Sequence, residues 1–332
     1  MKQFSVGVAL GSGSARGWAH IGVLQALKEM GIEPQVIAGC SIGSMVGASC
    51  AAGKLDELET WVKTLGWRDV FSFLDVHLSG GLIQGRKLFQ FFEKYMAGLD
   101  FEDLPIPCGA VATDLETGRE VWLRHGALAT AIRASISLPG LFTPYRTPSG
   151  RYLLDGGLVN PIPVTLCKAL GADVVIGVNL NNQLVGKHMR SPKRFGFMTD
   201  PYSLPQQQTD ADSQSDELMA AAGGALQSME QEQPFEFVKK ISEIFGFDDD
   251  PEEDVLESAN PPGMLDVVAT SINIMQDRIT RSRVAGDPPD VMINPNLAHL
   301  GLMDFYRAEE AIEEGRKAVR RVADQLEDYR QK

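Results

Sequence analysis

The residues best suited to chemistry in this sequence surround a serine at position 41. An apolar run at 36–38 leads into Gly39-Cys40-Ser41-Ile42-Gly43, and small residues with a helical pattern follow at 44–52. Gly-x-Ser-x-Gly between a strand and a helix is typical of a nucleophile elbow, a strained turn that projects the serine hydroxyl. Gly39 and Gly43 flank the serine because side chains there would collide across the bend. We therefore predict that Ser41 is a nucleophile; the alternative is a plain strand-to-helix connection.

A glycine-rich loop near the N-terminus, between a predicted strand at 4–10 and a helix at 18–30, is the second candidate element. The dinucleotide pattern Gly-x-Gly-x-x-Gly fails at Arg16, and no Gly-Lys-Ser/Thr follows to make a phosphate loop. A loop of this kind before a helix offers backbone N–H groups and a positive dipole end, which bind a phosphate or an oxyanion. Beside a serine nucleophile we predict the second use; the alternative is a flexible turn. The predicted oxyanion loop comprises Gly11, Ser12, Gly13, Ser14, Ala15 and Arg16.

A third motif, Asp155-Gly156-Gly157, follows a strand predicted at 152–154. Taken alone, Asp-Gly-Gly predicts the turn of a β-hairpin. The next six residues, at 158–163, do not alternate between apolar and polar as a returning strand would. A short helix at 164–170 and a strand at 173–179 are predicted to follow instead.

The other predicted elements alternate between strands and helices, which indicates an α/β protein with a sheet between helical layers. Before the third motif they are helices at 54–65 and 86–96, a strand at 105–114, its hairpin partner at 120–123 and a helix at 127–137. After it they are a helix at 264–285, a strand at 290–295 and an amphipathic helix at 307–329. The aromatic and glycine-rich stretch at 67–82 is a candidate loop over an acyl site.

Composition excludes several other classes of protein. The net charge is −13, but residues 200–260 hold sixteen acidic residues and two lysines, so the rest of the chain carries +1. Nucleic-acid binding is not expected, because no basic stripe exists to displace counterions from phosphates. No apolar run approaches the roughly 18 residues needed to cross a membrane. Four widely spaced cysteines predict reduced thiols in a cytoplasmic protein.

The three motifs, in this order and spacing, resemble the patatin-like phospholipase family, and in particular its small bacterial members. The linking stretches fit as well, notably 18–24 and 134–140, and the resemblance covers about residues 6–181. It implies a three-layer α/β/α sandwich with a mainly parallel central sheet. One departure is Ser12, which stands where the family usually has the middle glycine of Gly-Gly-Gly. Because a backbone N–H is kept, we expect the oxyanion role to survive.

The resemblance also implies a Ser–Asp dyad, with Ser41 as the nucleophile and Asp155 as its partner. Gly156 and Gly157 complete the aspartate motif. The implied activity is hydrolysis of carboxylic esters of lipids through an acyl-enzyme, with no metal and no cofactor. An aspartate of ordinary pKa, about 3.9, is a poor base, so we expect the site to desolvate Asp155 and raise its pKa. The expected partner is a lipid or ester substrate, with peripheral membrane contact left open.

A Ser–Asp–His triad is the alternative arrangement for this chemistry. His299 follows Ser41 and Asp155 in the chain order of the α/β-hydrolases, but an elbow after only the second strand comes too early for that fold. His20 is predicted to be a helix-packing residue, and Cys40 a packed neighbour of the nucleophile. The remaining histidines, in polar stretches with no partner pattern, are His77, His125 and His188.

A change of composition at 183–263 predicts an acidic, partly disordered insertion with two short helices, at about 216–227 and 235–244. Residues 1–182 and 264–332 would then form the catalytic domain. We favour a linker or partner site for the insertion over a lid, because its charge opposes anionic membrane surfaces. Two alternatives to a lipid hydrolase stay open: a non-lipid esterase or thioesterase, and a regulatory protein that keeps the fold without catalysis.

Overall fold

The computed structural model describes residues 4–73, 76–77, 82–83, 94–182 and 264–330. The chain divides into two units, Met1–Met189 with Ala269–Lys332, and Arg190–Val268, and almost all described residues belong to the first. The predicted acidic insertion, with its two short helices, lies outside the described residues, as does most of the predicted helix at 86–96. The domain boundaries therefore stay a prediction.

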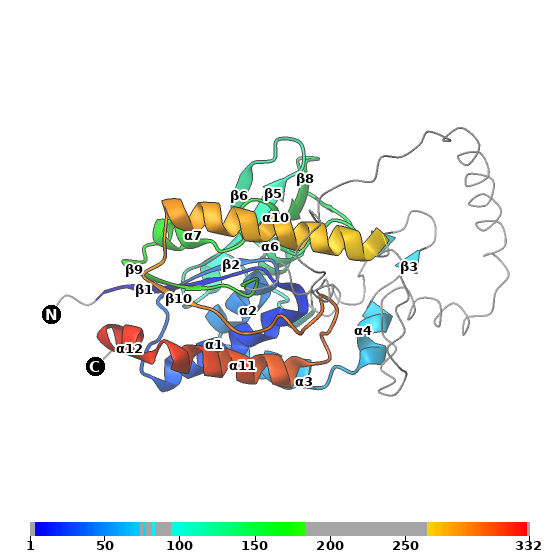
Figure 1. Cartoon of the computed structure of the whole chain (residues 1–332). Coiled ribbons are helices and arrows are strands. Elements are labelled where there is room, and N and C mark those ends of the chain that lie inside the picture. Colours follow the sequence, from blue (N-terminus) through cyan, green and yellow to red (C-terminus); the bar gives the residue numbers. More distant parts are fainter. Residues whose placement is uncertain (1–3, 74–75, 78–81, 84–93, 183–263, 331–332) are drawn as a thin grey trace, which may run out of the picture. The chain divides into compact units, whose positions relative to one another are not determined.

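A mixed, mostly parallel sheet forms the centre of the first unit (Figure 1). Its parallel strands lie in the order β10 (Val291–Ile293), β9 (Val174–Val178), β1 (Val6–Leu10), β2 (Val36–Cys40) and β5 (Cys108–Asp114). Antiparallel strands extend it beyond β5, namely β8 (Tyr152–Asp155), β7 (Tyr145–Arg146) and β6 (Glu120–Leu123). A separate small hairpin consists of β3 (Val76–His77) and β4 (Leu82–Ile83).

Helices cover both faces of the sheet, which confirms the predicted α/β architecture (Figure 1). Below the sheet in that view lie α1 (Ala19–Glu29), α2 (Ile42–Ala51), α3 (Leu55–Lys63) and α11 (Ala308–Arg321). Above it lie α7 (Val164–Ala169) and α10 (Met264–Gly286). The other helical segments are η1 (Ser14–Trp18), α4 (Trp67–Phe73), η2 (Phe101–Asp103), α6 (Leu128–Ser135), η3 (Gly156–Leu158), α12 (Ala323–Leu326) and η5 (Glu327–Tyr329).

The buried strands are apolar on both sides because both faces of the sheet are covered. In β1, Val8 and Leu10 belong to the larger core cluster, whereas Ala9 packs in a second cluster with residues of α7. Strand β9 divides in the same way, with Ile176 in the larger cluster and Val175 in the smaller. This alternation follows from the two-residue period of a strand.

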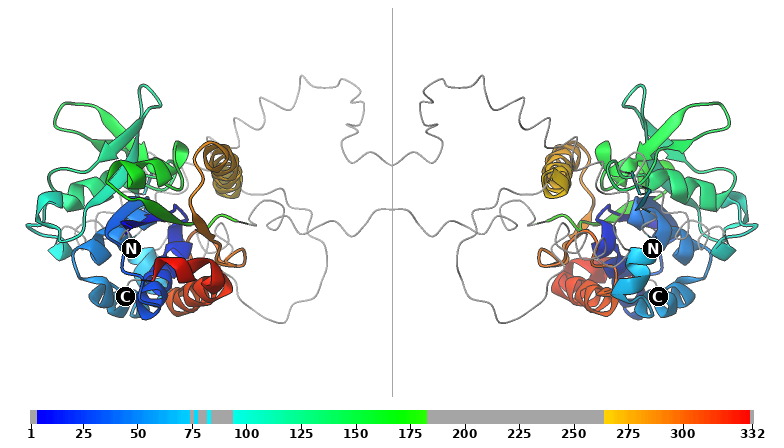
Figure 2. Two further views of the ribbon diagram at one scale, coloured as in Figure 1. Left: turned by 90° about the vertical axis from the view of Figure 1, so that its left-hand side faces the viewer. Right: turned by 90° about the vertical axis from the view of Figure 1, so that its right-hand side faces the viewer.

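Two glycines allow the helices α1 and α11 to pack closely. A Cβ atom on Gly22 would lie 1.8 Å from the carbonyl oxygen of Ile312, and one on Gly315 would lie 2.0 Å from that of Ala19. Both views of Figure 2 show α11 beside α1. The predicted apolar stripe of α11 is confirmed as its packing face, with Ala311, Ile312, Ala318 and Val319 buried.

One helix is shorter than predicted, and one turn motif depends on its context. The predicted helix at 307–329 ends at Arg321, because Val322 leaves helical geometry with φ −114° and ψ 18°. The Asp-Gly-Gly motif leads into η3, a 3₁₀ turn, and not into the hairpin that the motif alone would predict, which agrees with the lack of alternation at 158–163. Among the described residues, no helix has both the length and the apolar run needed to cross a bilayer.

Candidate active site

Strand β5 brings Ser41 and Asp155 together from segments 114 residues apart in the chain. Cys40, the last residue of β2, pairs with Val111, and Asp155, the last residue of β8, pairs with the next residue, Ala112. Strand β2 runs parallel to β5 and β8 runs antiparallel, so the carboxyl ends of both meet at this point of β5. Ser41 Oγ donates a hydrogen bond of 2.5 Å to Asp155 Oδ2.

The backbone of Ser41 has the strained geometry of a nucleophile elbow. Its φ of 54° and ψ of −125° lie outside the ordinary regions for a residue with a side chain, a conformation that costs about 1–3 kcal/mol. A hydrogen bond of 2.9 Å from Ser41 N to Ser135 Oγ holds it, and Ser135 Oγ in turn donates to Val111 O at 2.6 Å. Ser44 donates to Ser41 O from both its N and its Oγ.

The predicted elbow glycines are required by close backbone contacts. A Cβ on Gly39 would lie 2.4 Å from Ser44 Cα, and one on Gly43 would lie 2.3 Å from Leu10 O. In the aspartate motif, a Cβ on Gly156 would lie 2.2 Å from Val111 O. These three positions therefore admit only glycine while the surrounding backbone keeps its place.

Asp155 is fully buried, and burial raises its pKa to about 6, while hydrogen bonds from Ser41 and Gly157 act in the opposite direction. Gly157 N donates to Asp155 Oδ1 at 2.7 Å, so each carboxylate oxygen has one donor. Thr113 Oγ1 donates to Asp155 O, which fixes the main chain at the same residue. The carboxylate is thus oriented toward the serine and is more basic than an exposed aspartate.

The oxyanion loop is narrower than the predicted six residues. Four of the six amides already have backbone acceptors: Gly11 N donates to Val178 O, Ser12 N to Pro161 O, Ala15 N to Leu302 O and Arg16 N to Gly13 O. Within the part of the chain that the structure describes, the N–H groups of Gly13 and Ser14 have no acceptor. The amides of the other four residues are engaged in three tertiary bonds and one local turn bond, which leaves Gly13 and Ser14 as the candidate donors. An oxyanion role for this loop stays a prediction.

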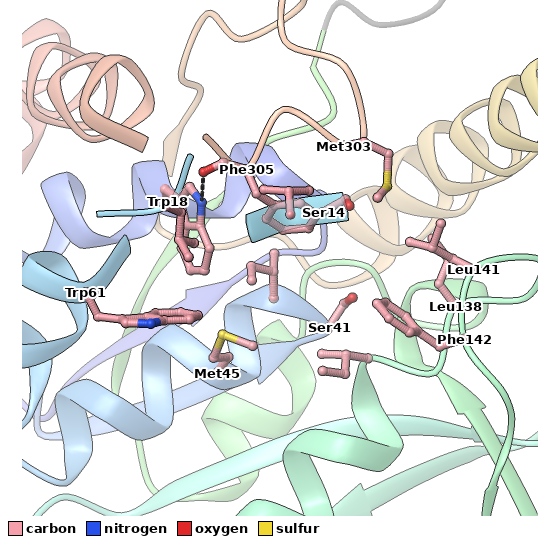
Figure 3. A pocket seen from close by; sticks show the side chains of 14 residues that line it. Ser14, Trp18, Ser41, Met45, Trp61, Leu138, Leu141, Phe142, Met303 and Phe305 are labelled. Carbon is pink, nitrogen blue, oxygen red and sulfur yellow. Dashed lines mark hydrogen bonds between the residues drawn. The ribbon is translucent and has the colours of Figure 1, made fainter. Parts of the chain in front are cut away.

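Ser14 lies at the edge of an apolar pocket that also contains Ser41. Its φ of 52° places it in the left-handed region, and its Oγ donates to Leu302 O at 2.6 Å. Figure 3 shows the Ser41 side chain directed into this pocket. The empty space of the pocket, together with the open solvent at its mouth, is about 690 Å³. Its described lining is almost wholly apolar: Ser14, Trp18, Ser41, Ile42, Met45, Trp61, Leu65, Val70, Ile136, Leu138, Leu141, Phe142, Met303 and Phe305.

The predicted loop at 67–82 is described only in part. Residues Trp67–Phe73 form the helix α4, and Val70 from it contributes to the pocket. Much of the remainder lies outside the described residues.

Neither His299 nor His20 contacts the Ser41–Asp155 pair. His299 is half-exposed and contacts Glu310 Oε1 at 2.7 Å. His20 is fully buried, and its Nε2 donates to Gly11 O at 2.8 Å, which leaves Nδ1 without a proton. Burial lowers the pKa of His20 to about 4, so it is a neutral residue that supports the loop. His188 lies outside the described residues, and His125 pairs with Glu102 at the surface.

The cysteine beside Ser41 is packed, as predicted. Cys40 is fully buried, and burial, followed by the nearby Asp155, raises the pKa of its thiol well above the usual range. A neutral buried thiol is a poor nucleophile. Within the described ranges, no three side chains of the metal-binding types lie close enough to hold an ion.

The C-terminal part of the chain contributes site residues that the sequence interpretation missed. The segment after β10 supplies Leu302, whose carbonyl accepts from Ser14 and Ala15, together with Met303 and Phe305 of the pocket. Trp18 Nε1 donates to Phe305 O at 3.1 Å (Figure 3). Helix α10 supplies Asn273 and Gln276, both buried against the oxyanion loop. Amide and apolar residues of this kind carry no local sequence signal of a site.

An α/β protein with a buried Ser–Asp pair at the rim of an apolar pocket is thus the class that the fold and site define. The patatin-like phospholipase family model matches residues 8–168. An uncharacterized NTE family protein of Mycobacterium tuberculosis is 34% identical over 343 aligned positions, covering 97% of this chain and 92% of that protein. The chain therefore belongs to the patatin-like phospholipase family, whose members are generally serine hydrolases.

Two further matches either cover a smaller share of the matched protein or have a lower sequence identity. Neuropathy target esterase sws of Drosophila melanogaster is 33% identical over 187 positions, which is 54% of this chain and 13% of that protein. The crystal structure of VipD from Legionella pneumophila aligns with 98% of this chain and 80% of that chain, with 12% identity and a TM-score of 0.43.

Proposed function

We propose that this protein is a serine acyl hydrolase that cleaves carboxylic esters of lipids. The observation that carries the proposal is the 2.5 Å hydrogen bond from Ser41 Oγ to the buried Asp155, at the rim of a pocket with apolar walls. Family membership supports the same reaction class. The apolar lining supports a long acyl group over a polar one, because burying acyl methylenes yields about 0.8 kcal/mol each.

In the acylation step, Asp155 Oδ2 accepts the proton of Ser41 Oγ while that oxygen attacks the ester carbonyl carbon. The charge that develops on the carbonyl oxygen is met by the N–H groups of Gly13 and Ser14. The tetrahedral intermediate then breaks its bond to the alcohol oxygen, which takes the proton from Asp155. The acyl group remains on Ser41 as an ester.

Deacylation uses the same groups in reverse order. Water gives a proton to Asp155 as it attacks the acyl carbon, and the second tetrahedral intermediate expels Ser41 Oγ. The proton returns from Asp155 to Ser41, and the fatty acid leaves. Since Asp155 must be ionised in the free enzyme, we expect kcat/KM to fall as pH drops through about 6.

The test compares Ser41→Ala, Asp155→Asn and His299→Ala with the wild type on p-nitrophenyl esters, phospholipids and lysophospholipids. We expect both dyad variants to lose about 10³-fold or more in kcat, and His299→Ala to retain wild-type activity. A fluorophosphonate probe followed by peptide mass spectrometry should label Ser41. Wild-type turnover by Ser41→Ala would contradict the dyad.

Failure of the probe to label folded wild-type protein would favour a non-catalytic role instead. Turnover restricted to short, soluble esters or thioesters would contradict the lipid substrate but not the dyad. Peripheral membrane contact, if it accompanies the activity, should appear as cosedimentation with phospholipid vesicles.

A further inference from the structure

A buried polar network joins helix α10 to the oxyanion loop. Ser12 Oγ donates to Gln276 Oε1 at 3.3 Å, and Asn181 Nδ2 contacts both Gln276 Oε1, at 3.0 Å, and Ser12 Oγ, at 3.3 Å. The three residues are 2–5% exposed. They come from the loop after β1, the turn after β9 and the helix α10, segments up to 264 residues apart in the chain. We call Ser12, Asn181 and Gln276 the α10 network.

One face of α10 provides the polar contacts. Asn273, Gln276 and Thr280 are all buried, and their spacing of three and four residues places them on one side of the helix. Asn273 Oδ1 accepts from the Arg16 guanidinium at 3.3 Å, and Arg16 Nε donates to Gly13 O at 3.1 Å. The helix therefore reaches both sides of Gly13, through Ser12 before it and Arg16 after it.

Gln276 also borders the aspartate of the dyad. A Cβ placed on Gly157 would lie 2.4 Å from Gln276 Nε2 and 3.0 Å from Asp155 Oδ1, so both atoms face the same small space. One carboxamide thus contacts the oxyanion loop through its oxygen and lies against the Asp155 turn through its nitrogen. This one side chain therefore contacts both the oxyanion loop and the Asp155 turn. In the proposed acyl transfer, these two parts of the site must keep a fixed separation.

The role of Ser12 differs from that of an oxyanion donor. Its N–H donates to Pro161 O and is unavailable to substrate. Its hydroxyl, in contrast, is the link from the loop to α10. A glycine at this position, as in the Gly-Gly-Gly pattern, would lack that link.

We propose that Ser12 and Gln276 are positioning residues, which hold the Gly13 and Ser14 amides at a fixed distance from the Ser41–Asp155 pair. The inference rests on the proposed acyl hydrolase function and assigns α10 a part in it. Positioning matters because a shift of about 1 Å in a reacting group can cost about 10²-fold in rate.

The test uses Ser12→Ala, Gln276→Ala and the double variant in the full-length protein, with p-nitrophenyl butyrate as substrate. Each single variant should lower kcat by about tenfold or more, with KM changed less than about threefold. Because the two side chains act through one contact, the double variant should be little slower than the worse single variant. Thr280→Ala is the matched control, since it alters the same buried face one turn away and should keep wild-type kcat.

The pH profile separates the two positions. Gln276→Ala opens space for water beside Asp155, so the acid limb of kcat/KM should move to lower pH. Ser12→Ala should leave that limb in place. If Gln276→Ala does not fold, Ser12→Ala, which removes one oxygen, carries the test alone.

Hydrogen exchange gives a readout that does not depend on turnover. Amides in the segment 11–17 should exchange faster in Ser12→Ala and Gln276→Ala than in the wild type or Thr280→Ala. Unchanged kcat and unchanged exchange in both variants would overturn the positioning role, even if Ser41→Ala is inactive. Inactive wild-type protein with faster loop exchange in the variants would instead contradict the proposed function while leaving the network's contact with the loop intact.

Discussion

In the proposed mechanism, Asp155 favours activity at the expense of stability. The mechanism needs a base, and the fold offers one by burying a carboxylate to which, among the described residues, Ser41 and Gly157 donate. Burial raises the pKa to about 6 in the folded protein, against 3.8 for an exposed aspartate. The proposed mechanism requires the ionised carboxylate, and burial makes that ionised form less stable in the folded protein than in water.

Replacing Asp155 with Asn should make the protein more stable at neutral and alkaline pH. Below pH 3.8 the carboxyl is protonated in both states and contributes no pH dependence. As pH rises through 3.8 to 6, the unfolded chain loses its proton while the folded protein keeps it, so the wild type loses stability. Above pH 6 this loss is constant at about 3 kcal/mol, by the linkage of 1.36 kcal/mol per pH unit.

Asparagine does not titrate, so Asp155→Asn should escape that loss. Urea unfolding at pH 4 and pH 8 measures it: the difference in unfolding free energy between variant and wild type should grow by about 2.4 kcal/mol in favour of the variant, because about 0.6 kcal/mol of the loss is already present at pH 4. An equal difference at the two pH values would show that Asp155 has an ordinary pKa in the folded protein.

At the scale of elements, three strands, the helix α6 and the helix pair α1–α11 hold the Ser41–Asp155 pair and the loop beside it. The carboxyl ends of β2 and β8 meet at Val111 and Ala112 of β5, and Ser135 of α6 bonds both Ser41 N and Val111 O. Helix α1, which follows the oxyanion loop, is held against α11 through Gly22 and Gly315. The site depends on backbone contacts with no room for a side chain.

Gly315→Ala should be destabilising although alanine favours a helix by about 1 kcal/mol over glycine. The added Cβ would lie 2.0 Å from Ala19 O, so α1 and α11 must separate, at a cost of about 1–3 kcal/mol or more. Gly286→Ala is the matched control, since nothing lies within 4 Å of its Cβ position at the end of α10. The free energy of unfolding, measured with urea, should fall for Gly315→Ala and stay within about 0.5 kcal/mol of the wild-type value for the control. Equal free energies of unfolding for the two variants would contradict the close packing.

The sequence predicts those parts of the site whose signal is local. Ser41 stands out because a strand, a tight Gly-x-Ser-x-Gly turn and a helix are contiguous, and apolar periodicity places the main strands and helices to within a few residues. Gln276 and Phe305 give no such signal, because an amide on a helix and an aromatic in a loop have many structural uses. The loop at 11–16 has the same limit: a glycine-rich loop predicts free amides, but only the fold shows that Ser12 N donates to Pro161 O and Ala15 N to Leu302 O.

At the scale of the whole molecule, segments from the N-terminal and C-terminal parts of the chain meet at the pocket. The family model matches residues 8–168, yet Met303 and Phe305 line the pocket, and Leu302 and Asn273 contact the oxyanion loop. The mycobacterial relative aligns with 97% of the chain, whereas the Drosophila esterase aligns with 54%. The segment at 302–305 therefore forms part of the pocket wall although it lies outside the residues that the family model matches. If the proposed function holds, this segment is where relatives would differ in their selectivity for the acyl group.

Met45 should control the length of acyl chain that the pocket accepts. It lies one turn after Ser41 on α2, is buried, and Figure 3 shows it between Ser41 and Trp61. Met45→Trp would fill the middle of the pocket, whereas Met45→Leu keeps nearly the same volume. A decanoyl chain must extend past this point and a butyryl chain need not, so the loss should depend on chain length.

We expect Met45→Trp to lower kcat/KM for p-nitrophenyl decanoate by about tenfold or more, and for the butyrate by less than about threefold, because each displaced methylene contributes about 0.8 kcal/mol. Met45→Leu should keep the wild-type ratio between the two substrates. Urea unfolding of both variants separates a filled pocket from a damaged fold, since overpacking also costs stability. An equal loss for both esters in a stable Met45→Trp protein would mean that the acyl chain binds elsewhere, and the apolar pocket would then have to serve the alcohol part of the substrate.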